Sequence, residues 1–251
     1  MAEVPGTRVL ELAEVTKRFG GVTAVSRCSM ALQPGRIYGL IGPNGSGKTT
    51  VFNCITGVEV RDTGAIRLRG RRIDGLAPHR IARFGVGRTF QVIRIFAELT
   101  ALENLLAVSW ADRTTALARA RELLAFVGLA PLAEELAGNL SYGQQKLVEF
   151  ARVLMMEPFL ILLDEPAAGI NRTLLNELLA AIRRLRDEGR TILIVEHDMK
   201  VVMDLCEHVF VLDYGEKIAE GPPEAIQRDE RVIEAYFGRG ASSRMTRGVP
   251  R

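Results

Sequence analysis

Apolar and polar side chains alternate over the first part of the chain. Between Arg8 and Leu32 the alternating stretches are short, and β-branched residues recur at positions 22–25. A period of two residues is typical of strands that bury one face. This segment is therefore predicted to form an N-terminal set of antiparallel strands.

Further along, short continuous apolar runs alternate with segments of helical spacing. The runs cover 37–41, 159–163 and 191–195, and the helical segments cover 49–56, 140–156 and the residues around Leu174 to Ile182. Such runs are typical of strands buried on both faces, and the alternation with helices favours an α/β fold with a mainly parallel sheet. Additional short strands are expected near 66–68, 86–90, 209–212 and 217–219.

The composition changes between about 100 and 139, where Leu, Ala, Glu and Arg dominate. Apolar residues at 117, 120, 123, 124 and 127 have helical spacing. We expect one domain over 1–238 with an α-helical subdomain inserted at about 92–158. The tail at 239–251 is rich in Arg, Gly and Ser and is predicted to be disordered.

A glycine-rich loop follows the run at 37–41 and fits the pattern G-x-x-x-x-G-K-[ST]. Backbone N–H groups of such a loop, with the N-terminus of the next helix, can surround phosphates. A chance turn is the alternative, but the order of strand, loop and helix favours a nucleoside triphosphate site in a P-loop NTPase core. Lys48 is expected to reach the β- and γ-phosphates, and Thr49 to bind Mg²⁺. The residues expected to bind nucleotide here are Gly42, Pro43, Asn44, Gly45, Ser46, Gly47, Lys48, Thr49 and Thr50.

Two other apolar runs end in polar residues suited to phosphate chemistry. Asp164 and Glu165 follow one run, so Asp164 is predicted to hold Mg²⁺ and Glu165 to polarise the attacking water. Without the phosphate loop, a solvated acidic pair would be the simpler interpretation. His197 follows the next run and is predicted to contact the γ-phosphate or that water. Gln91 ends another predicted strand, and its amide is predicted to contact Mg²⁺ or water.

The segment LSYGQQ at 140–145 predicts a second anion site. Its hydroxyl, its glycine backbone and the start of a helix can bind a phosphate, although a serine-capped helix is the simpler interpretation. Because the chain already has one phosphate loop, this site makes most sense as part of a neighbouring subunit's nucleotide site.

With these motifs in this order, the chain from about Leu10 to Phe237 resembles the ATP-binding cassette (ABC) family. The resemblance implies that Phe19 stacks on adenine, and that Ser141, Gly143 and Gln144 touch the γ-phosphate bound by the opposite subunit. Two positions depart from the usual pattern: Tyr142 stands where glycine is commonest, and Asn171 where many members have aspartate.

Several segments are similar to one subgroup, the larger of two ATPase subunits in bacterial branched-chain amino-acid importers. They are GRTFQ at 87–91, the segment at 103–106, YGQQ at 142–145 (the signature segment), EPAAGIN at 165–171, VEHDMKVVM at 195–203 and the ending at 231–238. The resemblance implies ATP and Mg²⁺ as cofactors, a second ATPase subunit forming a homo- or heterodimer, and permease subunits that hold the chain at the cytoplasmic face of the inner membrane. An extracytoplasmic substrate-binding protein would be an indirect partner.

Other functions stay open at this point. Urea or amide importers and the ATPase of lipopolysaccharide export share much of the pattern. Soluble cassette ATPases usually carry coiled-coil insertions or two cassettes, and a phosphate-loop kinase or GTPase would explain neither LSYGQQ nor His197. The apolar residues Val92, Ile93, Ile95 and Phe96 are either core or a surface that couples the site to membrane subunits.

Composition argues against nucleic acid as a partner and against a zinc site, a signal peptide and a membrane span. A formal net charge of +3 is too small to favour nucleic acid, and no such partner is expected. Three cysteines without C-x-x-C spacing indicate reduced thiols and no zinc site. The N-terminal residues have no continuous apolar core, so no signal peptide is expected, and no stretch reaches the ~18 apolar residues of a membrane span.

Overall fold

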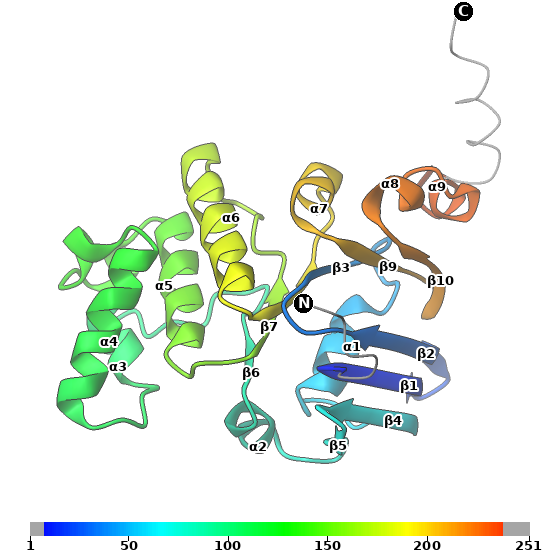
Figure 1. The fold of residues 1–251 in the computed structure, drawn as a ribbon, viewed down its shortest axis with the longest axis horizontal. Helices are drawn as coiled ribbons and strands as arrows, with labels where there is room; N and C mark the ends of the chain where they lie inside the picture. The colour runs from blue at the N-terminus through cyan, green and yellow to red at the C-terminus, as the bar shows by residue number, and fades with distance from the viewer. Residues whose placement is uncertain (1–7, 238–251) are drawn as a thin grey trace, which may run out of the picture.

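The computed structural model describes residues 8–237, which form two β-sheets flanked by helices (Figure 1). The predicted tail lies outside these residues. The strands are β1 (Leu10–Phe19), β2 (Val22–Leu32), β3 (Ile37–Ile41), β4 (Thr63–Leu68), β5 (Arg71–Arg72), β6 (Val86–Arg88), β7 (Leu160–Asp164), β8 (Thr191–Val195), β9 (His208–Asp213) and β10 (Glu216–Gly221). The helices are α1 (Lys48–Ile55), α2 (Pro78–Arg83), α3 (Ala101–Leu106), α4 (Arg113–Phe126), α5 (Tyr142–Leu154), α6 (Arg172–Asp187), α7 (Met199–Leu205), α8 (Pro223–Ile226) and α9 (Glu230–Phe237).

The N-terminal strands form the predicted antiparallel sheet, in the order β2-β1-β4-β5. Leu10 pairs with Leu32 across β1 and β2, and the register shifts between Leu12 and Val15. An inserted residue at such a bulge reverses which face of the strand is buried. Leu10, Leu12 and Val15 are therefore all buried, although Leu10 and Leu12 stand at even positions and Val15 at an odd one. Strict alternation does not predict this pattern.

The second sheet is mainly parallel, in the order β10-β9-β3-β8-β7-β6. Only the β9–β10 pairing in it is antiparallel, so the predicted α/β class is confirmed. Alternate residues of its inner strands join two different cores. Leu160 and Leu162 pack toward α1 and the antiparallel sheet, while Ile161 and Leu163 pack toward the helices on the opposite face. Burial on both faces explains the continuous apolar run.

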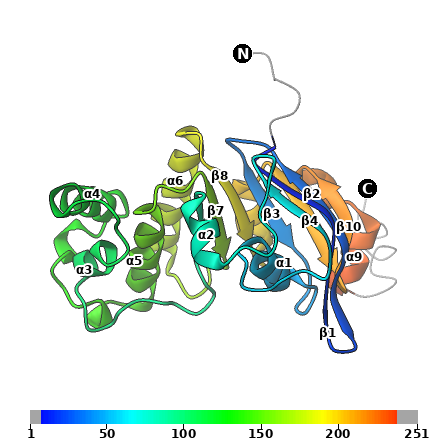
Figure 2. The same ribbon diagram turned by 90° about the horizontal axis from the view of Figure 1, so that it is seen from below.

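Helices α3 and α4 lie in the segment where helices were expected, beside α5 (Figure 2). Thr100 and Glu103 form a capping box on α3, and Asp112 caps α4. The buried amide of Asn104 accepts from the Phe96 N–H at 2.8 Å and donates to carbonyl oxygens of the same loop, which fixes the approach to α3. The boundaries 92–158 for an inserted subdomain stay a prediction.

All three cysteines are buried as free thiols, which agrees with the expectation from their spacing. Burial raises the pKa of Cys28 to about 12 and that of Cys54 to about 11. These thiols are therefore small apolar core groups rather than reactive ones.

Candidate functional site

Four neighbouring strands bring the predicted site residues to one edge of the sheet. In the order β3-β8-β7-β6 the strands are parallel, so their carboxyl ends lie together. The phosphate loop follows β3, His197 lies just beyond β8, Glu165 directly follows β7, and Gln91 lies beyond β6. Ligands of open α/β sheets bind at this edge.

Strands β9 and β2 pack closely against two glycines of the phosphate loop and leave no room for a side chain at either position. At Gly42 a Cβ would lie 2.0 Å from the Leu212 carbonyl oxygen, and at Gly47 it would lie 2.3 Å from the Ala24 carbonyl oxygen, where φ is +101°. Gly47 also caps α1 without a side-chain hydrogen bond. The first N–H groups of α1 can therefore donate to an anion.

Lys48 lies inside this loop, 8% exposed. Its Nζ donates to the carbonyl oxygens of Gly42 at 2.8 Å and Pro43 at 2.9 Å. Burial lowers the pKa of Lys48, an effect that the charges of Glu165 and Asp164 oppose. An anion at the loop would give the ammonium group a stronger partner than these carbonyls. Thr49 is exposed and Thr50 half-buried at the start of α1.

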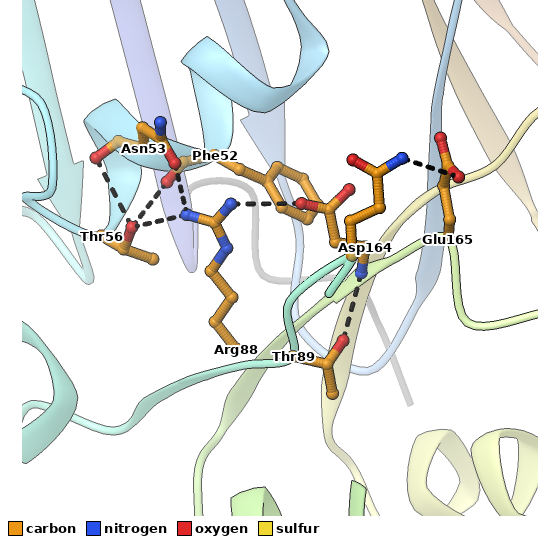
Figure 3. A network of polar contacts seen from close by, with 8 residues as sticks. Phe52, Asn53, Thr56, Arg88, Thr89, Asp164 and Glu165 are labelled. Carbon is orange, nitrogen blue, oxygen red and sulfur yellow. Dashed lines mark hydrogen bonds and ion pairs between the residues drawn. The ribbon is translucent and has the colours of Figure 1, made fainter. Parts of the chain in front are cut away.

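A buried cluster that the sequence interpretation did not include surrounds Asp164 (Figure 3). Arg88 forms an ion pair with Asp164 at 3.1 Å, and it also donates to Asn53 on α1 at 2.7 Å and to Thr56, the C-cap of α1, at 3.1 Å. The Asp164 N–H donates to the Thr89 hydroxyl. Burial raises the pKa of Asp164, and the neighbouring Arg88 opposes this rise. Arg88 thus ties β7 to the helix after the phosphate loop.

We expect Arg88→Met to lower the free energy of unfolding by about 3 kcal/mol, because it leaves a buried carboxylate without its counter-ion. The matched control is Arg183→Met, which removes an ion pair between two partly exposed side chains, Arg183 and Asp204, and should cost less than about 1 kcal/mol. Urea unfolding of both variants without nucleotide measures the difference. Equal losses of unfolding free energy in the two variants would contradict the prediction that the buried pair of Arg88 and Asp164 stabilises the fold more than an exposed pair.

Glu165 directly follows β7 with an unusual backbone conformation. Its φ of +48° is rare for a residue with a side chain, and such strain is often found at functional sites. The carboxylate accepts from the Gln91 amide at 3.3 Å and lies 3.9 Å from Nδ1 of His197. The structure thus brings together three of the predicted catalytic groups, from three adjacent strands.

The signature segment begins α5 with a capping box between Ser141 and Gln144. Ser141 is exposed, whereas Gly143 is buried against Leu174. The ring of Tyr142, the first departure from the family pattern, is half exposed and lies against Gly169. The second departure, Asn171, caps α6 by accepting from Leu174 N–H at 3.0 Å, as an aspartate would.

Phe19 ends β1 with its ring 45% exposed, and the Lys17 ammonium lies 4.8 Å from the ring centre. An exposed aromatic ring of this kind can stack on a planar base. Within residues 8–237 no cluster of three His, Cys, Asp or Glu side chains could hold a metal ion by itself. The oxygen donors of Thr49, Gln91 and Asp164 instead fit Mg²⁺, which takes few protein ligands and completes its shell with phosphates and water.

Two family models match parts of the chain. A model described as ABC transporter matches residues 25–168, and one described as Branched-chain amino acid ATP-binding cassette transporter matches residues 216–242. The chain is 43% identical to the high-affinity branched-chain amino acid transport ATP-binding protein BraF of Pseudomonas aeruginosa, over 92% of this chain and 98% of that protein. It is 41% identical to LivG of Escherichia coli K12 over the same shares.

A solved structure supports the fold independently. It is a dimeric ATP-binding cassette in a post-hydrolysis state with ADP and phosphate, with a TM-score of 0.78 and 26% identity over 85% of this chain and 98% of that one. In the part of this chain that the structure describes, no helix combines the length and apolar character needed to cross a membrane. The predicted family is confirmed: the chain belongs to the ABC transporter family, as one of its ATP-binding and ATP-hydrolysing subunits.

Proposed function

We propose that this chain is the ATP-hydrolysing subunit of an importer for branched-chain amino acids. The observation that carries the proposal is the match of residues 216–242 to a model specific to branched-chain amino-acid cassettes. This region contains β10, α8 and α9, which follow the phosphate loop, Asp164, Glu165 and His197 along the chain. The names of BraF and LivG support the same substrate class.

Two cassettes are proposed to close head to tail around two ATP molecules. In each site, Lys48 and the loop amides bind the phosphates of one protomer's nucleotide, and Phe19 stacks on its adenine. Ser141, Gly143 and Gln144 of the opposite protomer contact the γ-phosphate. The support is that Ser141 is exposed at the N-terminus of a thirteen-residue helix, a position that favours an anion.

Hydrolysis is proposed to depend on positioning and electrostatics rather than on a covalent intermediate. Glu165 accepts a hydrogen bond from the attacking water and orients it toward the γ-phosphorus. His197 and Gln91, which lie beside the Glu165 carboxylate, hold this arrangement. Lys48 and the opposite helix N-terminus stabilise the charge on the transferring phosphoryl group.

Thr49, Asp164 and Gln91 are proposed to hold Mg²⁺, since all three offer oxygen ligands at this edge of the sheet. The ion would neutralise charge on the β- and γ-phosphates. Asp164 already forms an ion pair with Arg88, so a positive charge beside this carboxylate is compatible with its buried surroundings.

Coupling to permease subunits is proposed to run through the segment after Gln91. Val92 is 77% and Phe96 52% exposed, whereas Ile95 packs against the core. A groove beside this segment offers both apolar and cationic contacts to a loop of a membrane protein; it is lined by Arg88, Arg94, Ile95, Phe96, Val108, Arg152, Val153 and Met156. Through such subunits the chain would sit at the cytoplasmic face of the inner membrane, with a second ATPase subunit and, indirectly, an extracytoplasmic binding protein.

The test combines co-purification with transport. Permease and ATPase partners that co-purify with the tagged chain from its native host should be reconstituted in proteoliposomes. We expect ATP-dependent uptake of leucine, isoleucine and valine that stops when Glu165→Gln replaces the wild-type chain. Uptake of urea or amides instead, or association with a lipopolysaccharide exporter, would overturn the substrate assignment. The absence of any co-purifying membrane protein would indicate a soluble cassette ATPase.

A further inference from the structure

Helix α5 carries two charged residues on buried positions of its central turns. Lys146 is 7% and Glu149 2% exposed, and their helix neighbours Leu147, Val148 and Phe150 belong to the hydrophobic core. Buried charges are unfavourable unless polar partners compensate them. Neither residue belongs to the nucleotide-binding motifs described above.

The partners of Glu149 lie in the segment that contains Gln91. Its Oε1 accepts from the Arg94 N–H at 3.2 Å, and the backbone of Phe90, like that of Arg94, opposes the rise that burial gives the pKa of Glu149. One turn further along α5, Arg152 donates to the Arg94 carbonyl oxygen. Helix α5 therefore holds the backbone on both sides of Gln91.

Lys146 contacts the segment that contains Glu165, the second of the two predicted catalytic segments beside α5. Its Nζ donates to the carbonyl oxygen of Glu165 at 2.7 Å. This carbonyl belongs to the residue with φ of +48°, so the hydrogen bond supports a backbone conformation that is otherwise unfavourable. Thr89, Phe90, Asp164 and both α5 residues line one small cavity, which places the three segments around a common centre.

One helix thus contacts two nucleotide sites in different ways. Its N-terminus at Ser141 faces the opposite protomer's nucleotide in the proposed dimer, while Lys146 and Glu149 contact the Glu165 and Gln91 segments of its own protomer. We propose that Lys146 and Glu149 are positioning residues that fix Glu165 and Gln91 to α5. When the N-terminus of α5 binds the nucleotide of the opposite protomer, these contacts align Glu165 and Gln91 for hydrolysis of the nucleotide in their own protomer. The inference rests on the proposed function, because it needs the shared site.

The experiment measures steady-state ATP hydrolysis by the purified full chain. We expect Lys146→Met and Glu149→Ala to lower kcat by roughly 10- to 100-fold with KM for ATP changed less than about twofold, because misplaced catalytic groups slow the chemical step without weakening the phosphate loop. Lys146→Arg and Glu149→Gln keep a donor and an acceptor at these positions and should stay within about fivefold of the wild type. Matched controls are Lys200→Met and Glu122→Gln, two exposed positions outside the site.

A second measurement separates positioning from folding. Amide hydrogen exchange at residues 90–94 should be faster by about tenfold or more in Glu149→Ala, while exchange in β3 stays unchanged, because only the first segment loses a hydrogen-bond partner. Unchanged kcat, a loss of activity that only follows the fraction of folded protein, or equal losses in the methionine and arginine variants at position 146 would overturn the inference.

A third measurement distinguishes this inference from the proposed function. Glu165→Gln with ATP should form a dimer, and it should still do so when Lys146→Met is added. If Glu165→Gln alone stays monomeric with ATP, the shared site fails and the inference fails with it. If the dimer forms but Lys146→Met and Glu149→Ala hydrolyse ATP normally in the wild-type background, only the positioning role is wrong.

Discussion

Replacing Glu165 with glutamine is expected to lower the rate of ATP hydrolysis by roughly 10²- to 10⁴-fold, while the affinity for ATP stays within about threefold. Glutamine keeps the size of the side chain and the hydrogen bond from Lys146 to the backbone carbonyl. It removes only the carboxylate that orients the attacking water beside Gln91 and His197. Phosphate release measures turnover, and titration with a fluorescent ATP analogue measures binding.

Asp198→Asn is a suitable control for this variant. Asp198 follows the neighbouring strand and caps α7 by accepting from Lys200 N–H, and asparagine can make the same bond. Its turnover should therefore equal that of the wild type. Hydrolysis by Glu165→Gln at a substantial fraction of the wild-type rate would contradict the role of Glu165 as the group that orients water.

Replacing Lys48 with methionine is expected to weaken ATP binding by roughly 100-fold or more, because a charge-assisted contact with the β- and γ-phosphates is lost. Lys48 and Lys146 are similarly buried, and burial lowers the pKa of both. Their partners differ: Lys48 donates to the phosphate-loop carbonyls and Lys146 to the Glu165 carbonyl. Methionine at position 48 should therefore change affinity, whereas methionine at position 146 should change kcat.

Titration of both methionine variants with the same ATP analogue tests this contrast. The thermal unfolding midpoint of Lys48→Met without nucleotide should stay close to that of the wild type, since methionine has a similar length and carries no charge to bury. Unaltered ATP affinity in Lys48→Met would contradict the contact between Lys48 and the phosphates. A similar loss of affinity in both variants would indicate that removing a buried charge weakens ATP binding whichever carbonyl oxygen the lysine contacts.

The long elements were predictable because each carries a repeated local signal. The runs that became β7 and β8 end in the structure within one residue of the prediction, and the phosphate loop lies between β3 and α1 as expected. Helices α2, α7, α8 and α9 were not predicted, because four to eight residues show too little helical periodicity. The bulge near Glu14 was not predicted either, because the alternation of apolar and polar residues does not reveal an inserted residue.

The site was predictable where a motif names the chemistry, but not where a residue acts through another residue. Arg88 was seen only as part of a strand, and Lys146 and Glu149 only as helix residues. The available signal was their charge within segments that are otherwise apolar, as in Lys146-Leu147-Val148-Glu149-Phe150. Such charges are buried only with partners, and those partners lie 19 and 55 residues away along the chain.

By itself, the sequence determined the α/β class, the phosphate loop and the residues that end each buried strand, because these depend on local spacing and backbone chemistry. Only the tertiary structure decided that β8 lies between β3 and β7, which brings His197 to Glu165, and that Arg88 neutralises Asp164. It also decided that α5 holds both the Gln91 and Glu165 segments. The physical reason is that strand order and the pairing of buried charges depend on contacts between distant segments, which form only when the chain packs.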